Sequence, residues 1–305
     1  MTYEQLSEQI FRKQSYLCVG LDTDLRKLPR HLLTEPDPVF AFNRAIIDAT
    51  ADLAVAYKPN IAFYEAQGPR GWESLQRTMD CVPADCFTIA DAKRGDIGNT
   101  SGLYARAFFD PSAAGLTFDS ITVAPYMGRD SVMPFLDYDG KWVILLALTS
   151  NPGSTDFQTI ITHPDLDIER DADGITAHGV YPLFCDSRYI YEKVIETAQS
   201  WVGPNSHERL MFVVGATQAH ELTYIRRLAP KHVLLVPGVG AQGGSLADVS
   251  RYGLTPNGGL LVNASRSILY ASDGPDFADR ARAEAKTLQT EMAGYLAGRI
   301  WDVTR

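Results

Sequence analysis

The chain has 305 residues, of which 45% are hydrophobic, and its formal net charge is −9 without any block of like charges. This composition supports one large buried core, and the mildly acidic balance argues against general nucleic-acid binding. The four cysteines lack a CxxC pair or a zinc-type spacing and are typical of reduced thiols in the cytoplasm. The N-terminus lacks the pattern of a signal peptide, and the longest apolar run, 143–148, is too short to span a bilayer, so we expect no membrane partner.

Short aliphatic runs alternate with helical patterns along the chain. Several of these runs are almost continuously apolar, which is typical of strands covered on both faces of a parallel sheet. In chain order the predicted strands span 17–21, 54–58, 87–92, 120–124, 142–149, 210–215, 232–236 and 260–263. After an amphipathic N-terminal helix, the predicted helices span 37–52, 71–79, 98–109, 188–201, 219–228, 246–252 and 276–298.

The alternation of strands and helices predicts right-handed βαβ units. About eight of these units in one domain favour a (β/α)8 TIM barrel over an open doubly wound sheet, and we expect residues 1–305 to form a single α/β domain. The stretch 153–186 does not fit the repeat, because it is polar and acidic, with HPDLDIERDADG at its centre. We expect residues 159–186 to be a long acidic loop insertion after strand 5, acting as a mobile lid or a surface elaboration.

The sequence at the end of the third predicted strand, DAKRGD, carries the strongest chemical signal. Catalytic groups of a TIM barrel stand at the carboxyl ends of its strands. Asp91 and Lys93 are two residues apart, so on a strand their side chains point the same way, and they form either a structural ion pair or part of a site. Asp96 follows Gly95 and is either a helix N-cap or a functional group.

Charged residues also end the first two predicted strands. Asp22 follows the first strand and Lys58 ends the second. Ionised groups are costly to bury, so a core does not collect Lys58, Asp91 and Lys93 at one end of a barrel without a use. Alternating cations and anions keep one another charged and can place a proton donor beside a carboxylate, which predicts an acid–base site.

The loops after the seventh and eighth predicted strands predict a phosphate site, as is usual for this fold. Glycines in VPGVGAQGG let backbone N–H groups approach an anion. Arg266, after the last strand, could donate two hydrogen bonds to a phosphate. Ser150, after the fifth strand, either hydrogen-bonds a polar ring or caps the next turn. The six histidines form no HxH or HExxH pattern, so we expect no metal site.

Together these motifs resemble the orotidine 5′-phosphate decarboxylase family. DAKRGDI matches the DxKxxDI signature of that family, and DAKRGDIGNTS is similar to its longer bacterial subgroup. The resemblance runs in order along nearly the whole chain, through VGLDTD, AYKPN, IADAKRGDIGNT, TVAPYMG, LTSNPG, PGVGAQGG and SRSI. It implies a TIM-barrel enzyme that decarboxylates orotidine 5′-monophosphate to UMP without a metal or cofactor, in the final step of de novo UMP biosynthesis.

The resemblance also implies a role for each charged residue of the site. Asp22 would hold the ribose hydroxyls, and Lys58 would join the charge network and touch the ribose. Asp91 would lie against the substrate carboxylate. Lys93 would protonate the vinylic carbanion that remains after CO2 departs, and its fixed ammonium group would stabilise that carbanion.

Further residues are implied to bind the substrate. Asp96, Ile97 and Thr100 would reach into the site of the partner subunit in a homodimer. Ser150 would contact the pyrimidine. The phosphate would be bound by Gln242 and Arg266.

The sequence departs from the family pattern at one place, and two alternatives remain. SRSI has Ser265 where the family often has glycine, which bears only on the backbone contact to phosphate. A metal-dependent DxKxxD barrel enzyme, such as a hexulose-phosphate synthase or a keto-gulonate-phosphate decarboxylase, is one alternative. The other is a non-catalytic barrel that only binds nucleotide. The complete set of Lys58, Asp91, Lys93 and Asp96 argues against it.

Overall fold

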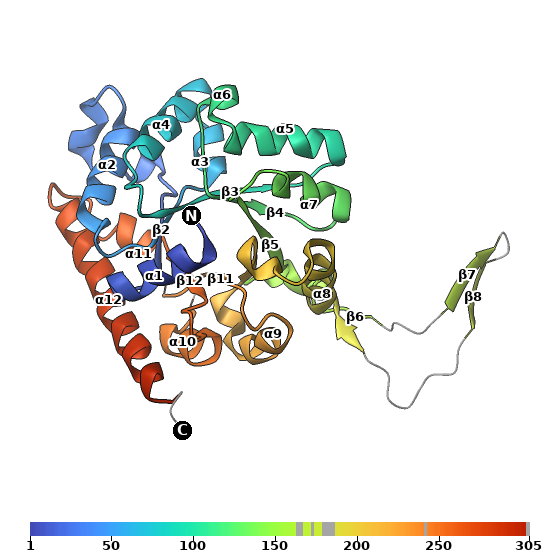
Figure 1. Cartoon of the computed structure of the whole chain (residues 1–305). Helices are drawn as coiled ribbons and strands as arrows, with labels where there is room; N and C mark the ends of the chain where they lie inside the picture. Colours follow the sequence, from blue (N-terminus) through green and yellow to red (C-terminus); the bar gives the residue numbers. More distant parts are fainter. Residues whose placement is uncertain (163–166, 172–173, 179–186, 241–242, 303–305) are drawn as a thin grey trace.

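The computed structural model describes residues 1–162, 167–171, 174–178, 187–240 and 243–302, with a barrel of eight strands at its centre (Figure 1). The barrel strands are β1 (Leu17–Gly20), β2 (Ala56–Lys58), β3 (Phe87–Arg94), β4 (Ser120–Val123), β5 (Trp142–Leu148), β10 (Leu210–Val214), β11 (Leu234–Pro237) and β12 (Leu260–Ala264). Neighbouring strands are parallel, and the barrel closes in the order β1–β12–β11–β10–β5–β4–β3–β2. The predicted (β/α)8 fold is confirmed, and each predicted strand overlaps one barrel strand.

Helices surround the barrel, and every predicted helix overlaps one of them. They are α1 (Tyr3–Lys13), α2 (Pro38–Thr50), α3 (Ile61–Glu65), α4 (Pro69–Asp80), α5 (Gly98–Phe109), α6 (Pro111–Ala114), α7 (Arg129–Leu136), α8 (Ile190–Val202), α9 (Leu222–Leu228), α10 (Leu246–Gly253), α11 (Arg266–Leu269) and α12 (Phe277–Asp302). The short 3-10 turns are η1 (Leu25–Lys27), η2 (Arg30–Thr34), η3 (Pro152–Asp156), η4 (Ser206–Glu208) and η5 (Ala216–Glu221). Within the described ranges, no helix is long and apolar enough to cross a membrane.

The helices that the sequence did not predict have a physical reason to be missed. α3, α6 and α11 have only four or five residues, which is too short for a helical period to stand out. α7 contains Pro134, which normally argues against a helix interior. α9 begins later than predicted, because η5 occupies the start of that segment.

The N-terminal helix α1 covers the amino ends of the barrel strands. Tyr3 Oη donates to the carbonyl of Lys231, ahead of β11, at 2.9 Å. The Met1 ammonium group pairs with Asp119, ahead of β4, also at 2.9 Å. Because these contacts occupy the amino end, the carboxyl end is left as the place for a site, as is usual for this fold.

The insertion follows β5 as predicted, but its described part is not loop throughout. β6 (Ile161–Thr162) pairs with β9 (Arg188–Tyr189), and β7 (Asp167–Asp171) pairs with β8 (Gly174–His178), both antiparallel. The β7–β8 hairpin lies apart from the barrel in Figure 1. The remainder of the predicted 159–186 stretch, residues 163–166, 172–173 and 179–186, lies outside the described residues.

Candidate active site

A polar cavity of about 190 Å³ lies at the carboxyl ends of the barrel strands. Its walls come from the ends of β1, β2, β3 and β12 and from the loop after β11. The predicted residues among those that line it are Asp22, Lys58, Asp91 and Arg266. The fold therefore brings together four residues that the sequence places at or near the ends of four different predicted strands.

At the centre of the site, two lysines bind the two oxygens of one buried carboxylate. Lys58 Nζ lies 2.7 Å from Asp91 Oδ2, and Lys93 Nζ lies 2.5 Å from Asp91 Oδ1. Asp22 Oδ1 lies 3.9 Å from Lys58 Nζ and is a buried atom without a hydrogen-bond partner among the described residues. Lys58 and Asp91 are nearly fully buried, whereas 50% of the Lys93 side chain is exposed. Lys93 is therefore the lysine of this pair that is open to solvent, whereas Lys58 and not Lys93 is among the described residues that line the cavity.

The opposite charges of the network keep its buried members ionised. Burial on its own disfavours the charged forms of Lys58 and Asp91. The neighbouring charges outweigh that penalty. Asp91 and Asp22 raise the pKa of Lys58 above its usual range, and Lys58 and Lys93 hold the pKa of Asp91 well below its usual range. Both groups are charged at neutral pH, so the cavity has fixed charges before a ligand arrives.

Asp91 and Lys93 meet, as predicted, but through a bulge in β3 and not through a regular pleat. Between two regular pairs of the β3–β4 ladder, residues 91–93 face the single residue Thr122. Lys93 has a φ of 49°, in the left-handed region that non-glycine residues rarely adopt. Thr122 Oγ1 accepts the Lys93 N–H at 2.9 Å and donates to Asp91 Oδ1 at 3.0 Å. The sequence did not point to Thr122, because its contacts depend on the register between β3 and β4.

Asp96 and its neighbours lie between β3 and the first turn of α5. Asp96, Ile97 and Thr100 occupy the end of the β3–α5 connection and the first turn of α5, and none of them is among the described residues that line the cavity. The N-cap position of α5 belongs to Ile97, and Asp96 Oδ1 accepts the Ile97 N–H at 2.8 Å. The N-cap interpretation of Asp96 is therefore wrong. Ile97 is 60% exposed, so this segment is accessible to a second chain.

The predicted phosphate side of the cavity lies at β11 and β12. Arg266 begins α11, separated from β12 by Ser265, and is exposed at the rim. The residue before Arg266, Ser265, packs closely against Gly20 of β1. Only glycine permits this contact, because a Cβ at position 20 would lie 1.9 Å from Ser265 Oγ. Gly238, after β11, also lines the cavity and has a φ of 98°. Gln242 lies outside the described residues.

Ser150 lies at the carboxyl end of the barrel but not in the cavity wall. It follows β5 after one intervening residue, and its Cβ lies 2.7 Å from where a Cβ of Gly215, after β10, would stand. In the part of the chain that the structure describes, the lining of the cavity does not include it. A contact from Ser150 to a ligand therefore requires a ligand that extends beyond this cavity.

The sequence also missed residues that shape the wall and hold the loop of Asp22. Asn60 and Asn263 line the cavity. Tyr270 Oη donates to the carbonyl of Asp22 at 3.0 Å and accepts the N–H of Asp24 at 2.9 Å. Because Tyr270 directly follows α11, these two hydrogen bonds connect the loop of Asp22 to the segment of Arg266.

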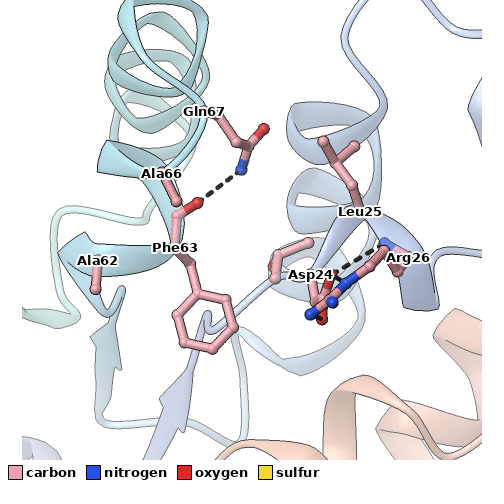
Figure 2. Close-up of a pocket in the computed structure, with 8 residues that line it drawn as sticks. Asp24, Leu25, Arg26, Ala62, Phe63, Ala66 and Gln67 are labelled. Carbon is pink, nitrogen blue, oxygen red and sulfur yellow. Dashed lines mark hydrogen bonds and ion pairs between the residues drawn. The ribbon is translucent and has the colours of Figure 1, made fainter.

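A larger cavity of about 460 Å³ lies beside the loop that follows Asp22, between that loop and α3. Figure 2 shows Phe63 of α3 on one side of it and Asp24 and Arg26 on the other. Asp24 pairs with Arg26 at 2.8 Å, which lowers the pKa of the carboxyl group to about 2. Its walls are mostly apolar, and none of the buried charged groups lines it, so the smaller cavity is the candidate active site.

In the described part of the chain, no group of three or more His, Cys, Asp or Glu side chains is placed to hold a metal ion. The charged groups of the cavity instead alternate in sign, with Lys58 and Lys93 on either side of Asp91. This arrangement is suited to holding an anionic substrate beside a proton donor.

Comparisons with known proteins all indicate one family. Residues 15–173 match the model of the orotidine 5′-phosphate decarboxylase / HUMPS family. The chain is 55% identical to the orotidine 5′-phosphate decarboxylase of Christiangramia forsetii, over 97% of this chain and 99% of that protein. It is 52% identical to that of Bacteroides fragilis, over 97% and 98%. The solved structure of Leishmania donovani OMP decarboxylase matches with a TM-score of 0.74 and 35% identity, over 97% of this chain and 99% of that one. The chain therefore belongs to the orotidine 5′-phosphate decarboxylase family.

Proposed function

We propose that this protein decarboxylates orotidine 5′-monophosphate to UMP and CO2, in the final step of de novo UMP biosynthesis, with Lys93 as the proton donor. The observation that carries the proposal is the buried Asp91 carboxylate with one lysine on each oxygen, in the wall of the cavity. Relatives that are 52% and 55% identical over nearly the whole chain are named orotidine 5′-phosphate decarboxylases. Their names support this reaction over that of a metal-dependent synthase.

The chemistry requires a stabilised carbanion. When the bond between the ring carbon and the carboxylate breaks, CO2 leaves and the electron pair stays on the ring carbon. The substrate has no ketone to accept these electrons, so catalysis depends on groups that bind the carbanion more strongly than the substrate. The Lys93 ammonium group supplies a fixed positive charge for this purpose and then transfers one proton to the carbon. Asp91 would lie against the departing carboxylate and keeps Lys93 oriented.

The rest of the nucleotide would be held by the rim of the cavity. Asp22 would bind the ribose hydroxyls, and Lys58 would contact the ribose while balancing the charge of Asp91. Arg266 and Gln242 would bind the phosphate, and Ser150 would contact the pyrimidine. The exposed position of Arg266 on the rim supports its part of this assignment. Phosphate binding far from the reacting carbon can supply energy for closing the site.

We also propose a homodimer in which each site takes residues from both chains. Asp96, Ile97 and Thr100 would enter the cavity of the partner subunit. Large apolar side chains are exposed on this segment and on neighbouring elements: Ile97 is 60% exposed, Leu103 of α5 is 65% exposed, and Tyr126 after β4 is 90% exposed. The exposed Ile97 side chain beside Asp96 is the observation that supports pairing through this segment.

We propose that the reaction needs no metal or cofactor and takes place in the cytoplasm. The carboxylate of Asp91 already has an ammonium group on each oxygen, which leaves it poorly suited to bind a metal ion. The test is to mix purified protein with orotidine 5′-monophosphate in excess EDTA and to measure UMP. We expect full activity after extensive dialysis. Loss of activity on chelation, with recovery on adding Mg²⁺, would instead support a metal-dependent barrel enzyme.

A further inference from the structure

We propose that Thr122 is a positioning residue for decarboxylation, whose hydroxyl group fixes Lys93 and Asp91 relative to each other. The inference deepens the proposed function and rests on the roles given there to these two residues. Thr122 is buried in β4, with 1% of its surface exposed. It is the single residue of β4 that faces the bulge of β3 at 91–93.

The hydrogen bonds of Thr122 have only one consistent arrangement. A carboxylate can only accept, so the hydroxyl proton of Thr122 goes to Asp91 Oδ1 at 3.0 Å. The backbone N–H of Lys93 can only donate, so Thr122 Oγ1 accepts it at 2.9 Å. One hydroxyl group thus holds the backbone of the proton donor and the carboxylate that orients its side chain.

The bulge makes this support necessary. Lys93 has a φ of 49°, which is disfavoured for a side chain of its type and persists only where surrounding contacts hold it. The regular β3–β4 ladder is interrupted at 91–93, so the Lys93 N–H bonds to the side chain of Thr122 in place of a ladder carbonyl. A regular strand would not turn Lys93 in this way, and Thr122 supplies the hydrogen bond that the interruption removes.

Thr122 also sets the direction of the carboxylate. Asp91 Oδ1 receives both the Thr122 hydroxyl and Lys93 Nζ, at 3.0 and 2.5 Å, while Oδ2 receives Lys58 Nζ at 2.7 Å. Rotation of the carboxylate would break at least one of these bonds. We infer that loss of the Thr122 hydroxyl group loosens Lys93 at the reacting carbon more than it weakens nucleotide binding.

The experiment compares Thr122→Val, Thr122→Ser and a matched control, Thr88→Val. Thr88, near the start of β3, also donates its hydroxyl group to a carboxylate and accepts a backbone N–H. It donates to Asp119 Oδ2 at 2.9 Å and accepts the Asp119 N–H at 2.8 Å. We expect Thr122→Val to lower kcat by about ten- to a hundredfold, which is the effect expected of a misplaced group. The dissociation constant for UMP should change by less than about threefold, because the contacts that bind the nucleotide in the ground state are retained.

Rescue and comparison separate positioning from a general loss of structure. Thr122→Ser, which keeps the hydroxyl group, should restore kcat to within about threefold of the wild type, and Thr88→Val should keep kcat although its thermal stability falls. The inference is overturned if Thr122→Val keeps its kcat, if it loses UMP binding in parallel, or if serine does not rescue it. Lys93→Ala is measured alongside. If Lys93→Ala is inactive and Thr122→Val is active, only this inference fails, whereas an active Lys93→Ala refutes the proposed role of Lys93 as proton donor.

Discussion

A mixture of two inactive variants tests whether each active site needs two chains. Lys93→Ala removes the proposed proton donor from the charge network, and Asp96→Ala removes a carboxylate that lies outside the cavity of its own chain. In a mixed dimer, the site on the Asp96→Ala chain keeps its own Lys93 and receives an intact Asp96 from the other chain. The opposite site carries both substitutions and is inactive.

The size of the expected recovery follows from this geometry. With random pairing about half of the dimers are mixed, and each has one intact site, so activity should approach about a quarter of the wild-type level. Neither substituted side chain is fully buried, so both variants should fold. The assay is UMP formation after the two chains are refolded together, with mixed dimers counted through two different affinity tags.

The matched control is a mixture of Lys93→Ala with Asp91→Ala. These two residues form an ion pair within one chain, so no pairing of the variants produces an intact site. Recovery in the test mixture but not in the control supports the shared site. If mixed dimers form and activity stays absent, Asp96 serves its own chain and the shared-site proposal is refuted.

Kinetic and stability measurements test three further assignments. Lys93→Ala should lower kcat by at least about a hundredfold while UMP binding persists, as for loss of a proton donor, and near-normal kcat would contradict that role. Arg266→Ala should chiefly raise KM, by about ten- to a hundredfold, since it removes a charge-assisted hydrogen bond to phosphate. Burial lowers the pKa of His232 from 6.5 to about 3, and its Nε2 lies 3.1 Å from Ser206 Oγ. Because the unfolded chain then binds the proton first as the pH falls, this histidine should cost about 2 kcal/mol of unfolding free energy between pH 7.5 and pH 5. In urea unfolding, His232→Gln should lose about 2 kcal/mol less unfolding free energy than the wild type between pH 7.5 and pH 5. A pH dependence equal to that of the wild type would refute the assignment.

The barrel could be predicted from the sequence because its strands are buried on both faces. The run at 143–148 is continuously apolar, and the structure places it in β5 among buried neighbours. The charged residues could be predicted because their positions at strand ends are visible in the sequence. The hairpin formed by β7 and β8 was missed, since its strands lie in a polar stretch without the pattern of a buried strand.

The bulge could not be predicted, since a register shift depends on how two strands pair and not on either strand alone. The sequence DAKR indicates that Asp91 and Lys93 share a face only if the strand is regular. In the structure they meet although Lys93 has a left-handed backbone, and Thr122 bonds to both residues. Sequence reasoning therefore found the charged groups and missed the neutral residue that we propose orients them.

The different burial of Lys58 and Lys93 indicates that the two lysines have different roles beside Asp91. Lys58 is nearly fully buried and its pKa is raised above its usual range, so it has neither the access to solvent nor the tendency to exchange a proton in each turnover. It therefore suits a permanent counter-charge. Lys93 binds the other oxygen of the same carboxylate with half of its side chain exposed, so after protonating the product it can take a new proton from solvent. If the two lysines were equally buried, one of them would have to regain its proton through the protein interior. Their unequal exposure favours Lys93 over Lys58 as the proposed donor, because only Lys93 can readily regain a proton from solvent.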